Sequence, residues 1–137
     1  MQRRIAVAIA FLLLAGSALA ADAGPLKVSL CEVLKHPADY SGKKLVLRVR
    51  ITATKEGAFL SDSECAKLGI DLWTDPAVRS DPGLSALHKA LREQSVDATM
   101  TGVFVPDQYD EIRHRRRSVF KATSAAEITE PHGAKSH

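Results

Sequence analysis

Hydrophobic and polar residues alternate from Leu47 to Thr52, and the hydrophobic positions keep the same period of two back to Leu45, across Val46. A period of two is typical of a β-strand with one buried face, because successive side chains point to opposite sides of the sheet. We therefore predict a half-buried strand here, with Arg48 and Arg50 directed toward solvent. Its buried face would consist of Leu45, Leu47, Val49 and Ile51.

Four further segments bounded by turn residues predict strands. Lys55-Glu56-Gly57 predicts a hairpin turn after the first strand, and Gly102 predicts a bulge or a strong bend in the fourth. The polar stretch from Pro106 to Arg117 predicts a long loop before the last strand. The four strands are expected at residues 58–61, 70–73, 96–104 and 119–128.

Two segments carry helical signals. Ser29 and Glu32 have the spacing of a capping box, which predicts a short helix that Pro37 prevents from running far. Further along, apolar residues recur at helical spacing and predict an amphipathic helix over residues 84–93. The recurring positions of this second helix are Leu84, Leu87, His88 and Leu91.

The order of these elements is three strands, a helix, and two more strands. That order is typical of the oligonucleotide/oligosaccharide-binding (OB) barrel, which commonly has a helix between its third and fourth strands. We predict a mainly β fold with some α structure (α+β): a five-stranded OB-like antiparallel barrel with an additional N-terminal helix. The chain length allows one domain, expected at residues 21–129, followed by a flexible tail at 130–137.

The N-terminus has the order of a secretory signal peptide, with Arg3 and Arg4, an apolar run to Leu14, and small residues ending at Ala20. We expect residues 1–20 to be removed after Ala20, although residues 21–23 offer a second small-x-small site. An uncleaved N-terminal anchor is the alternative. The apolar run is too short to cross a bilayer comfortably, and no second one follows. The expected location is the periplasm or the extracellular medium, with no transmembrane segment after cleavage.

Removal of the signal also changes the charge balance. The whole chain has 19 Lys and Arg against 16 Asp and Glu, and the expected mature chain has 17 against 16. This near-neutral balance argues against a nucleic-acid partner. The candidate anion-binding residues are clustered, but carboxylates at 107, 110 and 111 precede them, so we interpret the cluster as a solvated loop or edge. These candidates are Arg113, Arg115, Arg116 and Arg117.

Cys31 and Cys65 are the two cysteines of the chain. An even count in an exported protein favours a disulfide between them. Two free thiols, or a metal-binding or catalytic role, are the alternatives, but the pair lacks Cys-x-x-Cys spacing. The five histidines also lack metal-ligand spacing, so neither a metal nor another cofactor is expected.

The run from Val28 to Leu34, the turn at 37–42 and the strand at 45–51 form a pattern that continues into Gly57-Ala58-Phe59-Leu60-Ser61-Asp62 and Cys65. This pattern resembles a group of small exported bacterial proteins with two cysteines, mostly of unknown function. The resemblance continues through residues 69–73 and 96–104. It implies an OB-like fold and an exported location, and it implies no reaction.

Aromatic residues are the better candidates for ligand binding. If Ile70 and Leu72 face the core, Trp73 points the other way and could stack on a ligand. Tyr109, from the predicted loop between the last two strands, and Arg48 or Arg50 are expected nearby. A lone Trp in a small domain is usually packed, however, and our favoured expectation is that the N-terminal helix or the loop after Trp73 covers it.

These features predict a non-catalytic exported binding or accessory module of the bacterial envelope, whose partner is an unknown envelope protein or a cell-envelope saccharide. One alternative is a domain that binds single-stranded nucleic acid, suggested by the fold and the arginine cluster. Another alternative is a small periplasmic hydrolase, suggested by the paired loop carboxylates Asp62 and Glu64, or Asp110 and Glu111.

Overall fold

The alternating segment forms strand β2 (Lys44–Thr54), from which the rest of the sheet is built. Its four predicted inward residues are at most 3 % exposed, and Arg48 faces solvent. β2 pairs antiparallel with β3 (Gly57–Ser61) on one side and with β5 (Val96–Asp110) on the other. The structure is a computed structural model that describes residues 24–65 and 69–131.

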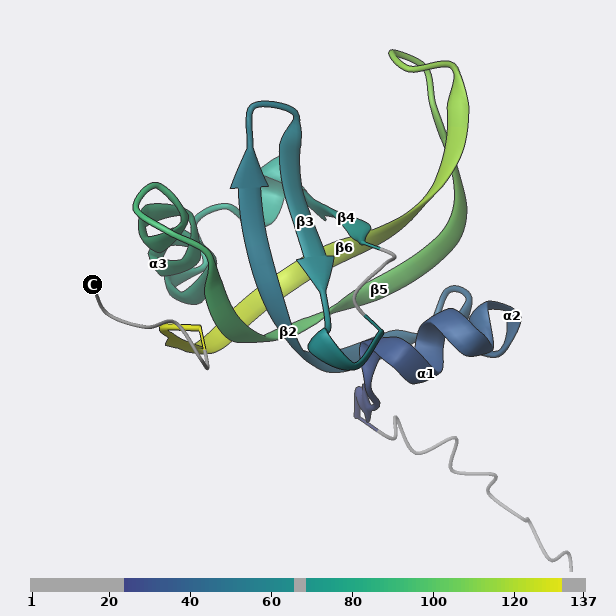
Figure 1. Cartoon of the computed structure of the whole chain (residues 1–137), viewed down its shortest axis with the longest axis horizontal. Helices are drawn as coiled ribbons and strands as arrows, with labels where there is room; N and C mark the ends of the chain where they lie inside the picture. The colour runs from purple at the N-terminus through teal and green to yellow at the C-terminus, as the bar shows by residue number, and fades with distance from the viewer. Residues whose placement is uncertain (1–23, 66–68, 132–137) are drawn as a thin grey trace, which may run out of the picture.

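The sheet closes into a five-stranded barrel, as Figure 1 shows. β4 (Ile70–Thr74) pairs with β3 and with β6 (Arg115–Thr129), and β6 pairs with β5. The barrel and the helix between its third and fourth strands confirm the predicted fold class. Pairing is mixed rather than wholly antiparallel, because a closed ring of five strands cannot alternate direction at every contact. The parallel contact in this ring lies between β4 and β6.

The N-terminal part packs against the barrel through two short helices, α1 (Leu30–Lys35) and α2 (Pro37–Tyr40), which follow the short strand β1 (Leu26–Lys27). The Ser29 hydroxyl accepts a hydrogen bond from the Glu32 backbone N–H at 3.1 Å, as expected of an N-cap. Leu30 and Val33 are fully buried in the core. The predicted disulfide is confirmed: Cys31 is bonded to Cys65, at the end of the 3₁₀ turn η1 (Ser63–Cys65). It fixes α1 to the segment after β3.

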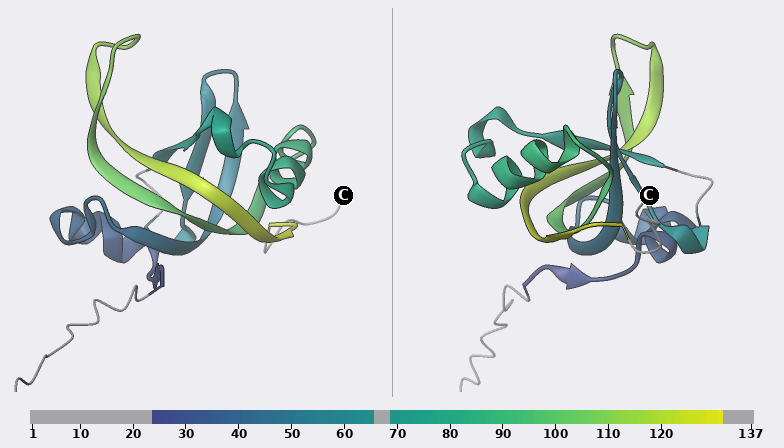
Figure 2. Two further views of the ribbon diagram at one scale, coloured as in Figure 1. Left: turned by 180° about the vertical axis from the view of Figure 1, so that it is seen from behind. Right: turned by 60° about the vertical axis from the view of Figure 1, so that its left-hand side comes forward.

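Helix α3 (Pro82–Leu91) begins two residues before the predicted position, after the 3₁₀ turn η2 (Pro76–Val78). Asp81 caps it by accepting a hydrogen bond from the Leu84 N–H at 3.0 Å, and Pro82 fits the first helical turn, where no N–H is needed. Leu84 and Leu87 are fully buried. The helix lies beside the barrel, next to β6 (Figure 2).

The prediction of a long loop at residues 106–117 is wrong. β5 and β6 continue through this polar segment as a paired hairpin that extends beyond the barrel, and the turn itself is confined to residues 111–114 (Figure 1). Hydrophobic alternation stops there because the hairpin has left the core. Cross-strand pairs of opposite charge, such as Asp110 opposite Arg115, accompany the extended pairing instead.

The irregularity predicted at Gly102 is confirmed. The β5–β6 register shifts between Thr101 and Gly102, and a Cβ atom at Gly102 would lie 2.3 Å from the Lys121 carbonyl oxygen. The two strands approach each other more closely here than a larger residue would allow. Of the other expectations, the signal peptide and most of the predicted tail lie outside the described residues. Within residues 24–65 and 69–131, no helix has the length and apolar character to span a bilayer.

Candidate functional site

Two of the predicted aromatic residues line the same groove. Trp73 of β4 and Tyr109 of β5 border a groove of about 490 Å³, whose walls include Leu72 and Val119. Trp73 is 45 % exposed and Tyr109 is 47 % exposed. Ile112, in the turn between β5 and β6, is 90 % exposed at its rim. This groove, which we call the aromatic groove, therefore presents apolar and aromatic surface to solvent, which is typical of ligand sites.

Trp73 is not covered, contrary to our favoured expectation. The disulfide fixes α1 at the end of β3, and α3 packs chiefly on β6. The segment with the η2 turn that follows Trp73 also leaves the ring exposed, so neither the N-terminal helix nor this loop covers it. The Nζ atom of Lys121, which is paired with Trp73 across the β4–β6 contact, lies 5.3 Å from the ring centroid. This is the distance of a cation–π contact. Lys121 thus holds the indole ring while leaving much of it accessible.

Ile70 is buried in the core, as alternation predicts. Asp71, the next residue, is only 8 % exposed although its side chain points the other way. Asp71 lies on the outer face of the barrel, where Arg117 of β6 forms an ion pair with its Oδ2 atom. The guanidinium group covers the carboxylate and compensates for its loss of water. Asp71 and Arg117 both line the same groove as Trp73.

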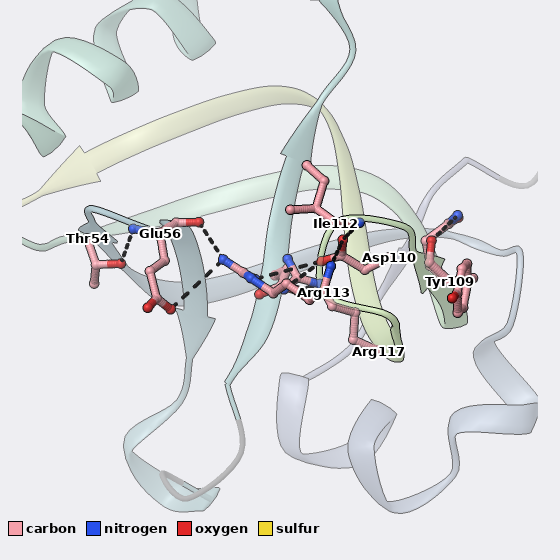
Figure 3. A network of polar contacts seen from close by, with 9 residues as sticks. Thr54, Glu56, Tyr109, Asp110, Ile112, Arg113 and Arg117 are labelled. Atoms are coloured by element: carbon pink, nitrogen blue, oxygen red, sulfur yellow. Dashed lines mark hydrogen bonds and ion pairs between the residues drawn. The ribbon is translucent and has the colours of Figure 1, made fainter.

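This ion pair belongs to a longer chain of contacts, drawn in part in Figure 3. Arg117 Nη1 lies 3.4 Å from Asp110 Oδ2, and Arg113 Nη1 lies 3.9 Å from the same oxygen. Arg113 also donates a hydrogen bond to the Glu56 carbonyl oxygen at 3.0 Å. We call Asp71, Arg117, Asp110, Arg113 and Glu56 the ionic chain. It connects β4, the β5–β6 hairpin and the β2–β3 turn, and its first three members line the groove.

Asp110 is the centre of the ionic chain. Its Oδ1 atom accepts hydrogen bonds from the backbone N–H groups of Ile112 and Arg113, at 3.0 and 3.1 Å. The pKa of Asp110 is lowered, chiefly by the hydrogen bond from the Arg113 N–H. The Ile112 hydrogen bond and the charges of Arg117 and Arg113 lower the pKa further, whereas burial of the carboxyl group opposes them. The carboxylate therefore remains ionised and closes the turn that carries Ile112.

The predicted anion cluster is largely neutralised within the fold. Arg113 and Arg117 belong to the ionic chain, and Arg116 Nη1 lies 3.0 Å from Asp107 Oδ2. Arg115 has no carboxylate within ion-pair distance among the described residues. The expected neutralisation by upstream carboxylates thus holds for Asp107 and Asp110, but the part of the chain that the structure describes shows no such pair for Glu111.

Arg48 and Arg50, expected near Trp73, line a different groove of about 420 Å³ formed by β2, the end of β3 and neighbouring residues. Arg48 donates to the Thr129 hydroxyl at 2.9 Å, and Arg50 Nε lies 3.1 Å from Asp97 Oδ1. Arg50 pairs with Ser61, the last residue of β3. Leu72, the residue before Trp73, pairs with Ala58 near the start of β3. The structure does not bring these arginines to the aromatic groove.

Of the two carboxylate pairs considered for hydrolysis, Asp62 and Glu64 lie beside the disulfide, whereas Asp110 and Glu111 line the Trp73–Tyr109 groove. Asp62 Oδ1 accepts a hydrogen bond from the Glu64 backbone N–H at 3.0 Å, which stabilises the η1 turn. Both carboxylates and the Cys31 sulfur come within 4.8 Å of one another. That sulfur is bonded to Cys65 and has no thiolate to offer. The arrangement is accounted for by its role in the turn.

Sequence reasoning missed Asp71, Lys121 and Glu56 as parts of the groove and its ionic chain. Asp71 had a signal, because a charged residue between Ile70 and Leu72 in a short apolar strand requires a partner. Lys121 and Glu56 had no comparable signal. Their roles depend on the β4–β6 register and on the meeting of two hairpin turns.

Comparisons with protein-family models, with curated protein sequences and with solved structures each gave no significant match to this chain.

Proposed function

We propose that this chain is an exported, non-catalytic binding module of the bacterial envelope and that its ligand occupies the Trp73–Tyr109 groove. The observation that carries the proposal is the convergence of two half-exposed aromatic side chains on one groove. Exposed rings offer flat apolar faces that stack on sugars or on partner side chains, at a low cost in conformational entropy.

We further propose that the barrel is an OB fold. Its strands are ordered β2-β3-β4-β6-β5 and return to β2, with α3 between the third and fourth barrel strands. In OB folds the ligand commonly lies on the second and third strands, between the loop joining strands one and two and the loop joining four and five. The equivalent loops here are the β2–β3 and β5–β6 turns, which the Arg113–Glu56 contact connects.

Export is supported by the signal-like sequence at residues 1–20 and by the Cys31–Cys65 disulfide. Structural disulfides persist mainly in oxidising compartments such as the periplasm. The ligand is therefore sought in the envelope, and a saccharide suits the groove best. Sugar rings stack on aromatic faces through their apolar C–H side, and their hydroxyl groups can donate hydrogen bonds to carboxylates such as Asp110.

Fluorescence titration tests the proposal directly, because Trp73 is the single tryptophan of the chain. We expect soluble peptidoglycan fragments to change its emission with a saturable dependence on concentration. Tyr109→Ala should weaken this binding by about tenfold, the scale of losing one aromatic contact. Arg48→Ala, in the separate groove, is the matched control and should bind as the wild type does. An emission that stays constant at millimolar fragment concentration would contradict the proposal.

A further inference from the structure

A second groove, of about 780 Å³, lies between α3 and β4. Ser85, His88, Lys89 and Arg92 border it from the helix, and Arg79 borders it from the segment before the helix. Leu72 and Trp73 line both this groove and the aromatic groove. The two grooves therefore meet at the indole ring. We call this second one the α3 groove.

The α3 groove is positively charged for a reason visible in the helix. Residues 85, 88, 89 and 92 are spaced by three, one and three positions, which places them on one face of α3 beside the buried stripe of Leu84 and Leu87. Arg79 is positioned at the other end, where its carbonyl oxygen accepts a hydrogen bond from the Ser85 hydroxyl at 3.1 Å. The helix face and the preceding segment thus direct three permanent cations to one groove.

These cations differ from the arginines of the β5–β6 hairpin. None of the residues lining the α3 groove is acidic. Among residues 24–65 and 69–131, no carboxylate lies within ion-pair distance of Arg79, Lys89 or Arg92, whereas Arg113, Arg116 and Arg117 all have such partners. The sequence concentrates its arginines at 113–117, where three of the four have carboxylate partners, whereas the three cations of the α3 groove have none among the described residues. An anionic group entering the α3 groove would therefore meet cations without local competition.

We infer that the α3 groove binds the anionic substituent, a carboxylate or a phosphate, of a saccharide whose neighbouring ring stacks on Trp73. This inference rests on the proposed function and names its ligand class. The two grooves differ in charge: the α3 groove has cations and no carboxylate, whereas the aromatic groove has the carboxylates of Asp71, Asp110 and Glu111 beside the cations of Arg117 and Lys121. A polyanion with charge at every unit, such as a nucleic acid, would meet these carboxylates along its path. A saccharide with its charge at one end of the bound segment fits both grooves.

The experiment compares a tetrasaccharide that carries one glucuronate, at its non-reducing end, with the methyl ester of the same tetrasaccharide, followed by Trp73 fluorescence of the chain without residues 1–20. Esterification removes the charge and keeps the sugar backbone. At low ionic strength we expect the charged probe to bind about tenfold more tightly, because each exposed ion pair contributes roughly a twofold to threefold gain. This preference should diminish at molar salt, where exposed charges are screened.

Three variants separate charge from fold. The triple variant Arg79→Ala, Lys89→Ala, Arg92→Ala should lose the preference for the charged probe. The double variant Arg79→Lys, Arg92→Lys keeps the charge and should retain the preference. A matched triple variant removes three exposed lysines outside both grooves and should behave as the wild type does. These control positions are Lys27, Lys35 and Lys43.

Equal binding of the two probes, with no effect of the α3 triple variant, would overturn the inference and leave the proposed function intact. An unchanged Trp73 emission with both probes at millimolar concentration would also overturn it, and the peptidoglycan titration would then decide the proposed function independently. Tighter binding of a thymidine tetranucleotide than of the glucuronate-terminated tetrasaccharide would overturn the saccharide assignment. A charge preference that survives Tyr109→Ala without any loss of affinity would uphold the α3 groove and count against the aromatic groove.

Discussion

Arg113 donates a hydrogen bond to the backbone carbonyl oxygen of Glu56, 57 residues away in the chain, at a distance of 3.0 Å (Figure 3). The bond joins the turn of the β5–β6 hairpin to the turn of the β2–β3 hairpin. The Glu56 side chain adds little to this contact, since its Oε2 atom lies 3.9 Å from Arg113 Nη2 and the side chain is 75 % exposed. The backbone contact is therefore what fixes one hairpin relative to the other.

Arg113→Ala should loosen the β5–β6 turn, whereas Glu56→Ala should not. We expect the arginine substitution to lower the free energy of unfolding by about 1 kcal/mol, the usual contribution of one hydrogen bond, and to speed amide exchange at residues 111–114. The Glu56 substitution should cost less than about 0.5 kcal/mol, as exposed ion pairs do. Hydrogen exchange and urea denaturation measure both. Equal effects of the two substitutions would show that the side-chain pair, and not the backbone contact, joins the turns.

Asp71→Ala should be among the most destabilising single substitutions on the barrel surface. It leaves the Arg117 side chain, which is 22 % exposed, with Asp110 alone as a carboxylate partner, at 3.4 Å. We expect a loss of about 2–3 kcal/mol in urea denaturation, below the 3–5 kcal/mol typical of fully buried pairs. Asp107→Ala removes the partner of Arg116 in an exposed pair and should cost less than about 0.5 kcal/mol. A similar loss in both variants would contradict the role given to burial.

Asp110 should make stability depend on pH at the acidic end. Because its pKa is lowered in the folded state, the ionised carboxylate stabilises the fold fully above its ordinary pKa of about 3.9, and this contribution is lost as the pH falls below that value. The wild type should therefore lose its advantage over Asp110→Asn as the pH falls from about 5 to 2. Denaturation midpoints of both proteins across this range measure the effect. A stability difference that does not change with pH would contradict it.

Reduction of the Cys31–Cys65 disulfide should destabilise the domain substantially. The bond closes 34 positions of sequence, which corresponds to about 4 kcal/mol in the chain-entropy estimate. The double variant Cys31→Ser, Cys65→Ser should lower the unfolding free energy by about 2–4 kcal/mol and release α1 first. Thermal denaturation with and without reductant measures this, and the double variant should be insensitive to reductant. A wild type equally stable under both conditions would contradict a structural role for the bond.

Local patterns predicted the barrel well because buried hydrophobic residues recur at every second position in core strands such as β2 and β5. The inward face of β2, the Ser29 cap, the break at Pro37 and the bulge at Gly102 each depend on a few neighbouring residues. The extension of β5 and β6 could not be predicted in this way. Beyond the core there is no apolar face to create a pattern, and the pairing is accompanied by charges such as those of Asp107 and Arg116, which meet only when the hairpin forms.

The candidate site was predicted in part. Trp73 and Tyr109 were identified from alternation and expected loop position, although Tyr109 lies in a strand. The exposure of Trp73 depends on where α1 and α3 pack, which no local pattern records. The polar face of α3, with its cations Lys89 and Arg92, was present in the sequence at positions 85, 88, 89 and 92, beside the apolar stripe from which the helix was predicted. The fold then determined which cations remain without carboxylate partners.

Chemical-shift mapping by two-dimensional NMR tests the aromatic groove most directly. Soluble peptidoglycan fragments are added to the isotopically labelled chain without residues 1–20, and the backbone amides and the Trp73 indole N–H are followed. The account predicts saturable shifts centred on Trp73, Tyr109 and Ile112, with the amides of Arg48 and Arg50 unchanged. Shifts centred on Arg48 and Arg50, or no shifts at all at saturating fragment concentrations, would contradict it.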